Sequence, residues 1–143
     1  MVIKSSDLRK ELIDKLNYLD KDEIKIIEQA IDYAYSKHEG QYRKTGEEYI
    51  IHPLSVAIIL TTIKADKDTI IASLLHDVLE DTPTPKEELE NLFGKTVANL
   101  VDGVTKINSI NVSTENEYLT NYYKKIIVGM SEDVRVIIIK LAD

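Results

Sequence analysis

The chain has 143 residues, enough for one domain of ordinary size that buries roughly two-thirds of its unfolded surface. It contains no Cys, which excludes disulfides and thiolate metal sites, so any metal ion has to be held by His and carboxylate groups. Its formal net charge of −7 argues against a broad nucleic-acid surface, and no apolar run approaches the roughly 20 residues that span a bilayer.

Helices are predicted along the whole chain, because Gly and Pro are few and apolar residues recur with the helical period of about 3.6 positions. The first helix is expected near 6–16. A second, capped by Asp20 or Asp22, should stop near Gly40 and be followed by a polar loop over 41–51. Pro53 suits the first turn of a third helix near 54–63, because the N–H that proline lacks has no partner there.

A fourth helix is predicted over 67–81, and a fifth should begin with a capping box at Thr84-Pro85-Lys86-Glu87 and end at Gly94. A sixth is expected over 95–101, followed by a loop over 106–114. A seventh, over 115–130, carries a tyrosine stripe that is more typical of packing than of base stacking. The apolar run in the last segment, 132–143, also fits a buried strand, but Ser131 as a cap and the helical surroundings favour an eighth helix.

The expected fold class is therefore all-α, a bundle of about eight helices in one domain over residues 1–143, with 1–20 as a helical lead-in. Residues 137–143 contain no Gly, Pro or other stop signal. We therefore expect the natural protein to continue beyond Asp143.

The fourth helix carries four side chains that handle metal ions or protons, namely His76, Asp77, Glu80 and Asp81. On a helical wheel they share one face with the small residues Thr69 and Ser73, which would leave room for an ion and a substrate phosphate. The alternative is a solvated outer face. A solvated face usually carries Lys, and this face has no Lys or Arg, which favours a metal site.

Three segments can in principle meet at one ion: His52, the His76-Asp77 pair and Asp143. Two imidazoles and two carboxylates suit Mn²⁺, Fe²⁺ or Zn²⁺. Each segment alone is weak support, because a His before a Pro is usually a helix-entry residue and a terminal Asp is usually solvated.

Glu80 and Asp81 are candidates for proton transfer, because hydrolysis needs an acceptor near the attacking water and a donor near the leaving group. Negative charge at the carboxyl end of a helix is unfavourable, and a nearby cation would remove that penalty. The compact basic turn at Arg43, Lys44 and Thr45 can contact a base and phosphates, although an ordinary exposed loop explains it equally well. His38 is interpreted as a surface or packing residue.

Several ordered motifs resemble the hydrolase domain of the RelA/SpoT homologue family, from about Ile27 to the end of the chain. They are RKTGEEYIIHP at 43–53, SLLHDVLEDT at 73–82, FG at 93–94, VDGVTK at 101–106 and KLAD at 140–143. The resemblance implies an HD-type helical domain that binds Mn²⁺. We expect a cytoplasmic location, and the absence of Cys is compatible with that reducing compartment. The resemblance also implies removal of the 3′-pyrophosphate of the guanosine tetra- and pentaphosphates ppGpp and pppGpp, as the N-terminal part of a longer bifunctional enzyme.

By motif position, the resemblance implies that His52, His76, Asp77 and Asp143 ligate Mn²⁺ and that Glu80 and Asp81 are the catalytic acidic pair. Arg43 would pack on guanine, with Lys44 and Thr45 near the nucleotide. The family usually has Ser at the last of these positions, and Thr keeps the hydroxyl.

Two departures from the family pattern matter. The motif normally continues past Lys-Leu-Ala-Asp into Arg-Leu-His-Asn and a nearby Thr, which this sequence lacks, so we expect weak binding or slow turnover. Residues 120–125 also differ from the usual Ala-Glu-Asn-x-Arg-Lys.

Two other functions remain open. One is an HD phosphohydrolase of another nucleotide, and the other is a non-catalytic nucleotide sensor, favoured by the missing C-terminal residues. Glu80 and Asp81 argue against a sensor, because two extra carboxylates do not help to bind an anion. No binding of nucleic acid or a membrane is expected.

Overall fold

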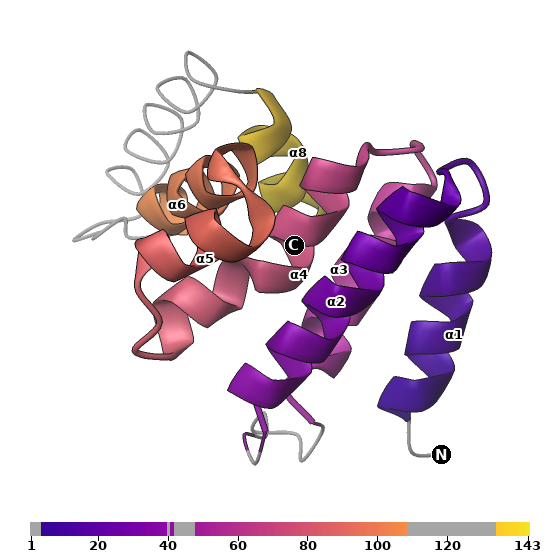
Figure 1. Ribbon diagram of the computed structural model, residues 1–143, viewed down its shortest axis with the longest axis horizontal. Coiled ribbons are helices and arrows are strands. Elements are labelled where there is room, and N and C mark those ends of the chain that lie inside the picture. The colour runs from indigo at the N-terminus through magenta and orange to yellow at the C-terminus, as the bar shows by residue number, and fades with distance from the viewer. Residues whose placement is uncertain (1–3, 40, 42–47, 109–133) are drawn as a thin grey trace, which may run out of the picture.

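The computed structural model describes residues 4–39, 41, 48–108 and 134–143. Within these ranges the chain forms seven helices and no strand, which confirms the all-α fold class. The helix predicted over 115–130 lies outside the described residues, as does the cap predicted at Ser131. Figure 1 shows α4 between two groups of helices, with α1, α2 and α3 on one side and α5 and α6 on the other.

The first group begins with α1 (Ser5–Lys15) and α2 (Lys21–Lys37). Asp20 starts α2 with a capping box, in which its carboxylate accepts from the Glu23 N–H at 2.8 Å and Glu23 accepts from the Asp20 N–H at 3.3 Å. The cap therefore lies at the first of the two predicted aspartates. One face of α2 is buried in the core through Ile27, Ala30, Ile31 and Ala34.

The third helix, α3 (Ile51–Thr61), begins three residues earlier than predicted. Ile50, the N-cap, and Ile51 are both buried, and the Ile51 N–H donates to the Glu48 carbonyl at 3.1 Å, so the helix begins within the buried apolar run. Pro53 still lies in the first turn, where a missing N–H costs little. The earlier start places His52 inside the first turn of the helix.

The central helix, α4 (Lys67–Asp81), has the predicted bounds but is not an amphipathic surface helix. It packs against α2, α3, α6 and α8, and every residue from Thr69 to Val78 is buried. Thr69 and Ser73 are 2% and 0% exposed, and their hydroxyls donate to the Asp66 carboxylate and the Ile70 carbonyl. The prediction that they leave room for an ion and a phosphate is wrong, because neighbouring helices cover both flanks of α4.

The second group contains α5 (Lys86–Phe93) and α6 (Lys95–Asn108). The predicted capping box of α5 is wrong. Pro85 is the N-cap and makes no side-chain cap hydrogen bond, while the Thr84 hydroxyl lies 2.7 Å from that of Thr82. Gly94 ends α5 with φ of 99°, as predicted from its tolerance of that conformation.

The sixth helix is longer than predicted, because α6 continues to Asn108 instead of ending at Val101. Residues 106–108 therefore do not belong to the predicted loop, and residues 109–114 lie outside the described part of the chain. Val101 and Val104 are fully buried, and this packing extends the helix through residues of modest helix propensity.

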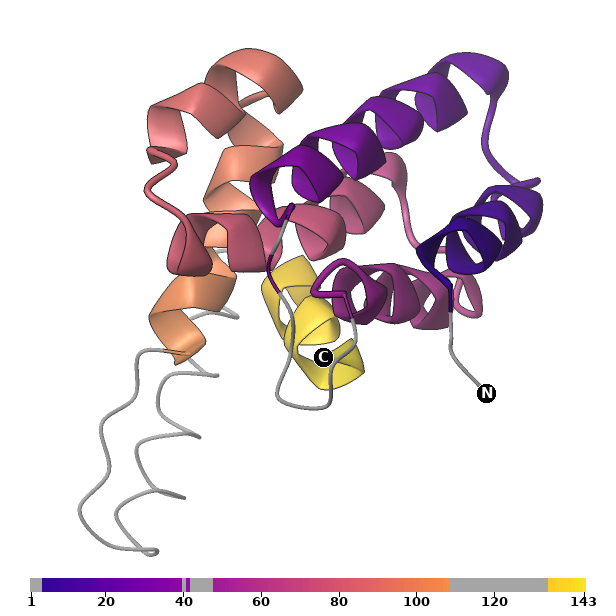
Figure 2. The same cartoon turned by 90° about the horizontal axis from the view of Figure 1, so that it is seen from below.

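The last helix, α8 (Val134–Ala142), confirms helix over strand for the described part of the final segment. It packs against α6, α3 and α4, and Figure 2 shows it beside α3. A Cβ placed on Gly103 of α6 would lie 2.8 Å from Cγ2 of Val136, so the missing side chain allows the two helices to approach closely. This packing fixes the position of Asp143, which directly follows α8.

Candidate metal centre

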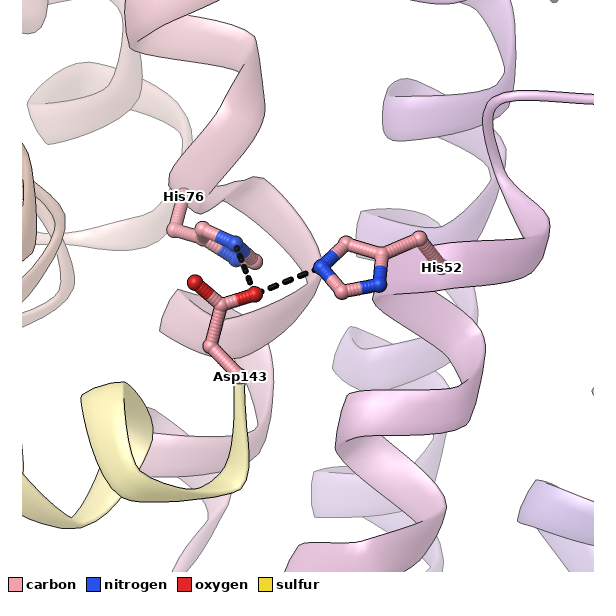
Figure 3. A group of neighbouring side chains, drawn as sticks. All are labelled: His52, His76 and Asp143. Atoms are coloured by element: carbon pink, nitrogen blue, oxygen red, sulfur yellow. Dashed lines mark hydrogen bonds and ion pairs between the residues drawn. The ribbon is translucent and has the colours of Figure 1, made fainter. Parts of the chain in front are cut away.

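Side chains from three distant parts of the chain meet at one point: His52 in α3, His76 in α4 and Asp143 after α8 (Figure 3). Oδ1 of Asp143 lies 2.5 Å from Nε2 of His52 and 3.4 Å from Nε2 of His76. The two imidazole centroids are 6.0 Å apart, and one donor atom of each residue lies within 4.8 Å of the others. The fold thus brings together three of the four predicted ligands, although 91 positions separate His52 from Asp143.

Asp77, the fourth predicted ligand, borders the same point. Its Oδ1 lies 3.2 Å from Nε2 of His76, and the residue is 8% exposed. Asp77 also forms a second group with Glu80 and Asp81, in which one carboxylate oxygen of each lies within 4.8 Å of the others. Asp77 therefore connects the histidines with the acidic pair one helical turn further along α4.

The ring of His76 is held in a fixed orientation. Its Nδ1 lies 2.6 Å from the Ser73 carbonyl, which can only accept, so Nδ1 carries a hydrogen. Nε2 then faces the Asp77 and Asp143 carboxylates, but neither contact has the geometry of a hydrogen bond. Nε2 of His76 and Oδ2 of Asp77 are both buried without a hydrogen-bond partner. A buried imidazole nitrogen between two carboxylates is an arrangement that a proton or a metal ion completes.

Burial and charge act in opposite directions at this centre. Burial lowers the pKa of His76, but the contact with Asp143, the charge of Asp77 and the Ser73 carbonyl together raise that pKa to about 9. Hydrogen bonding to His52, and then the contact with His76, holds the pKa of Asp143 well below its usual range. Burial raises the pKa of Asp77, although His76 and His52 oppose this. A positive charge between the two carboxylates is therefore electrostatically favourable.

The donor set fits a divalent cation. Two imidazole nitrogens and two carboxylate oxygens form a mixed set of the kind that Mn²⁺, Fe²⁺ and Zn²⁺ accept. The unpartnered Nε2 of His76 and Oδ2 of Asp77 would gain a partner from such an ion. Without an ion, the proton on His76 is the charge that compensates the two carboxylates.

The acidic pair lies at the exposed end of α4. Glu80 and Asp81 are both exposed, in contrast to His76 and Asp77 one turn earlier. Asp81 accepts a hydrogen bond from the Tyr49 hydroxyl. The pair is therefore accessible to a ligand while remaining next to the buried histidine centre.

The basic turn cannot be placed relative to this centre, because Arg43, Lys44 and Thr45 lie outside the described residues. The residues on either side of the turn, Gln41 and Glu48, line a polar cavity of about 320 Å³, together with Tyr35, His38, Glu39, Tyr49 and Ile50. His38 is 3% exposed and stacks on Tyr49. Of the two predicted roles for His38, surface or packing, the structure shows packing.

Two contributors to the centre were missed by the sequence reasoning. The Ser73 carbonyl orients His76, and the Tyr49 hydroxyl binds Asp81. The carbonyl three residues before a helical His is always close by, so the spacing of Ser73 and His76 offered a signal. Tyr49 offered none beyond its place within the motif at 43–53.

Comparison with known proteins identifies the family to which the chain is similar. The profile of a family described as the HD domain matches residues 30–143. Among the described helices, none is long and apolar enough to cross a lipid bilayer.

Individual relatives are similar over most of this chain. It is 48% identical over 126 residues to the bifunctional (p)ppGpp synthase/hydrolase SpoT of Escherichia coli K12. The matched region covers 88% of this chain and 18% of that protein. It is 51% identical over 117 residues to the guanosine-3′,5′-bis(diphosphate) 3′-pyrophosphohydrolase of Aquifex aeolicus, covering 82% of this chain and 16% of the relative. The chain thus spans less than a fifth of the length of these two relatives.

A solved structure, described as a metazoan ortholog of SpoT that hydrolyses ppGpp, superimposes with a TM-score of 0.62 at 29% identity, covering 82% of this chain and 65% of that one. These matches confirm the resemblance to RelA/SpoT homologues that the motifs indicated. On the match over residues 30–143, the chain belongs to the HD domain family.

Proposed function

We propose that this chain is a Mn²⁺-dependent hydrolase domain that removes the 3′-pyrophosphate of ppGpp or pppGpp, giving GDP or GTP and pyrophosphate. The single observation that carries the proposal is the meeting of His52, His76 and Asp143 next to Asp77, in a chain whose relatives include ppGpp hydrolases. A divalent metal is implied by the HD domain family, and the choice of Mn²⁺ rests on the resemblance.

In this proposal His52, His76, Asp77 and Asp143 hold the cation. The Ser73 carbonyl keeps a hydrogen on Nδ1 of His76, so that Nε2 would be the nitrogen that gives its lone pair to the cation. When bound, a divalent cation supplies Lewis-acid activation of the phosphate and of water. Of the four ligands, His76 and Asp77 are buried, and burial strengthens the attraction between their side chains and a cation.

Glu80 and Asp81 carry the proton transfers. Hydrolysis breaks the bond between the ribose 3′ oxygen and its phosphorus, with a water molecule giving its oxygen to the phosphorus and a proton to the 3′ oxygen. A carboxylate of the exposed pair accepts a proton from the water, and the pair returns one to the leaving oxygen. Both residues lie on the turn of α4 that follows His76 and Asp77. A phosphate bound to the cation would therefore lie close to the acidic pair.

Arg43, Lys44 and Thr45 would bind the nucleotide, with the guanidinium on the base and the ammonium and hydroxyl near phosphate. Tyr49, which belongs to the same sequence motif at 43–53, donates a hydrogen bond to Asp81, and this contact supports a role for the motif at the acidic pair. The net charge of −7 does not oppose such binding, because a local basic cluster and a cation together can hold a polyanion.

The test is pyrophosphate release from ppGpp by the purified chain with Mn²⁺, beside a His76→Ala variant and a panel of other nucleotides. We expect release that requires Mn²⁺, is abolished by His76→Ala and is specific for ppGpp and pppGpp. Release from another nucleotide instead would make the chain a different HD phosphohydrolase. Tight calorimetric binding of ppGpp without Mn²⁺ and without turnover would make it a sensor, and either result would overturn the proposal.

A further inference from the structure

Tyr49 connects two segments of the chain that the proposed function uses separately. Its hydroxyl donates a hydrogen bond to the Asp81 carboxylate at the end of α4, 32 positions away. Tyr49 itself lies between the basic turn and the start of α3. One side chain therefore links the sequence motif at 43–53, to which nucleotide binding is assigned by the proposed function, to the proposed proton-transfer pair.

Both the backbone and the ring of Tyr49 are held by residues at the end of α2 and just after it. Its backbone N–H donates to the Gln41 carbonyl at 3.1 Å, and its ring stacks on the imidazole of His38 with centroids 4.6 Å apart and planes at 25°. His38 is 3% exposed, and its Nδ1 lies 3.1 Å from Oε1 of Gln41. The phenol thus projects from a buried base at the end of α2, and its hydroxyl has a defined position.

The orientation of the Asp81 carboxylate is less restricted by packing than that of the buried Asp77. Asp81 is the last residue of α4 and is exposed, so its side chain has rotamer freedom that the buried Asp77 lacks. It also lies at the negative end of the helix dipole, with no basic residue in the last turn. A donor held at a fixed point selects one orientation of this carboxylate.

We propose that Tyr49 is a positioning residue that holds Asp81 in the orientation needed for proton transfer, with His38 as the base on which it stacks. The inference rests on the proposed function, because it assigns a role within that reaction. It does not require Tyr49 to touch the substrate or the cation. Its effect should therefore appear in turnover and not in binding.

The test compares Tyr49→Phe with the wild-type chain in the ppGpp and Mn²⁺ assay. Phe keeps the ring that stacks on His38 and removes the hydroxyl that donates to Asp81. We expect kcat to fall about tenfold, because a misoriented catalytic group lowers the rate, while KM and the Mn²⁺ dissociation constant stay within about twofold of wild type. His38→Ala, which removes the stack, should lower kcat in the same way.

Tyr33→Phe is the matched control. The Tyr33 hydroxyl donates to the Glu88 carboxylate at 2.6 Å, and its ring packs edge-on against Phe93, so this change removes the same kind of bond between α2 and α5. We expect wild-type kcat from Tyr33→Phe. Wild-type kcat in Tyr49→Phe, or equal losses in both variants, would overturn the inference while leaving the proposed function intact. A wild-type chain that binds Mn²⁺ but releases no pyrophosphate would overturn both.

Discussion

The polar side chains at the amino end of α4 have partners within the chain, whereas toward its carboxyl end some buried polar atoms have none. At the amino end, Asp66 accepts from the Thr69 N–H at 2.9 Å and from Arg135 at 3.0 Å, so a negative group at the positive end of the dipole is paired. At the carboxyl end the side chains are acidic, the last turn has no basic residue, and Nε2 of His76 and Oδ2 of Asp77 are buried without a hydrogen-bond partner.

This difference separates a structural end from a functional end within one helix. Unpaired buried polar atoms and acids at a helix carboxyl terminus both cost stability, and a fold retains them where a ligand completes them. The amino end requires nothing beyond the chain itself. We therefore expect changes at the two ends to affect different properties, and the following predictions run from the largest effect to the smallest.

Asp77→Asn should nearly abolish activity. The change keeps the shape of the side chain and removes a charge from the buried centre, so a loss of about 4 kcal/mol of transition-state stabilisation, about a thousandfold in kcat/KM, is expected. The measurement is pyrophosphate release with saturating Mn²⁺. The matched control is Asp68→Asn at the amino end of the same helix, which should keep wild-type activity. Turnover in Asp77→Asn close to wild type would remove the functional distinction between the two ends.

Mn²⁺ should stabilise the chain through the carboxyl end alone. At a free concentration of 100 times the dissociation constant, an ion that binds only the folded state adds about 2.7 kcal/mol to the free energy of unfolding. Chelator-treated protein should show this gain in denaturant unfolding when Mn²⁺ is added back. Asp77→Asn should show almost none of it and Asp66→Ala all of it. An equal gain in both variants would place the ion elsewhere.

Gly103→Ala should weaken both fold and site, because the new Cβ would lie 2.8 Å from Cγ2 of Val136 on the helix that carries Asp143. We expect a loss of about 1–3 kcal/mol in unfolding free energy and weaker Mn²⁺ binding. Denaturant unfolding and metal titration measure the two effects. Adding Val136→Ala to Gly103→Ala should restore much of the Mn²⁺ affinity by removing the clash. Unchanged affinity in Gly103→Ala would show that α8 adjusts without moving Asp143.

Asp66→Ala should cost about 1 kcal/mol of stability through loss of the N-cap and leave activity at 25 °C unchanged. Thermal unfolding and the pyrophosphate assay measure these outcomes. A large loss of activity would mean that the two ends of α4 are coupled through the helix.

The same variant has an expected pH signature. Burial opposes ionisation of Asp66, but the hydrogen bonds from Thr69 and the charge of Arg135 outweigh it and lower the pKa below the ordinary value of 3.8. The stability that the ionised carboxylate adds is therefore fully present above pH 3.8 and is lost as pH falls through the lower, folded-state pKa. The stability difference between wild type and Asp66→Ala should be constant near pH 6 and shrink below pH 4. A difference that grows on acidification would contradict this assignment.

Local chemistry made α4 and its bounds predictable. Its apolar period and Pro83 after it act within a few residues, and the adjacency of His76 and Asp77 is a property of the chain itself. The same reasoning failed for the Thr84 capping box and the length of α6. Pro85 moved the start of α5 by one residue, and burial of Val101 and Val104 carried α6 onward.

The sequence by itself determined the helical class, the kinds of ligand available and the order of the motifs, because side-chain chemistry and the 3.6-residue period are local properties. Only the tertiary structure decided that both flanks of α4 are buried, that Asp143 contacts His52, and that Tyr49 reaches Asp81. These depend on how helices far apart in the chain pack against one another. No periodicity within a single helix encodes which partner will cover it.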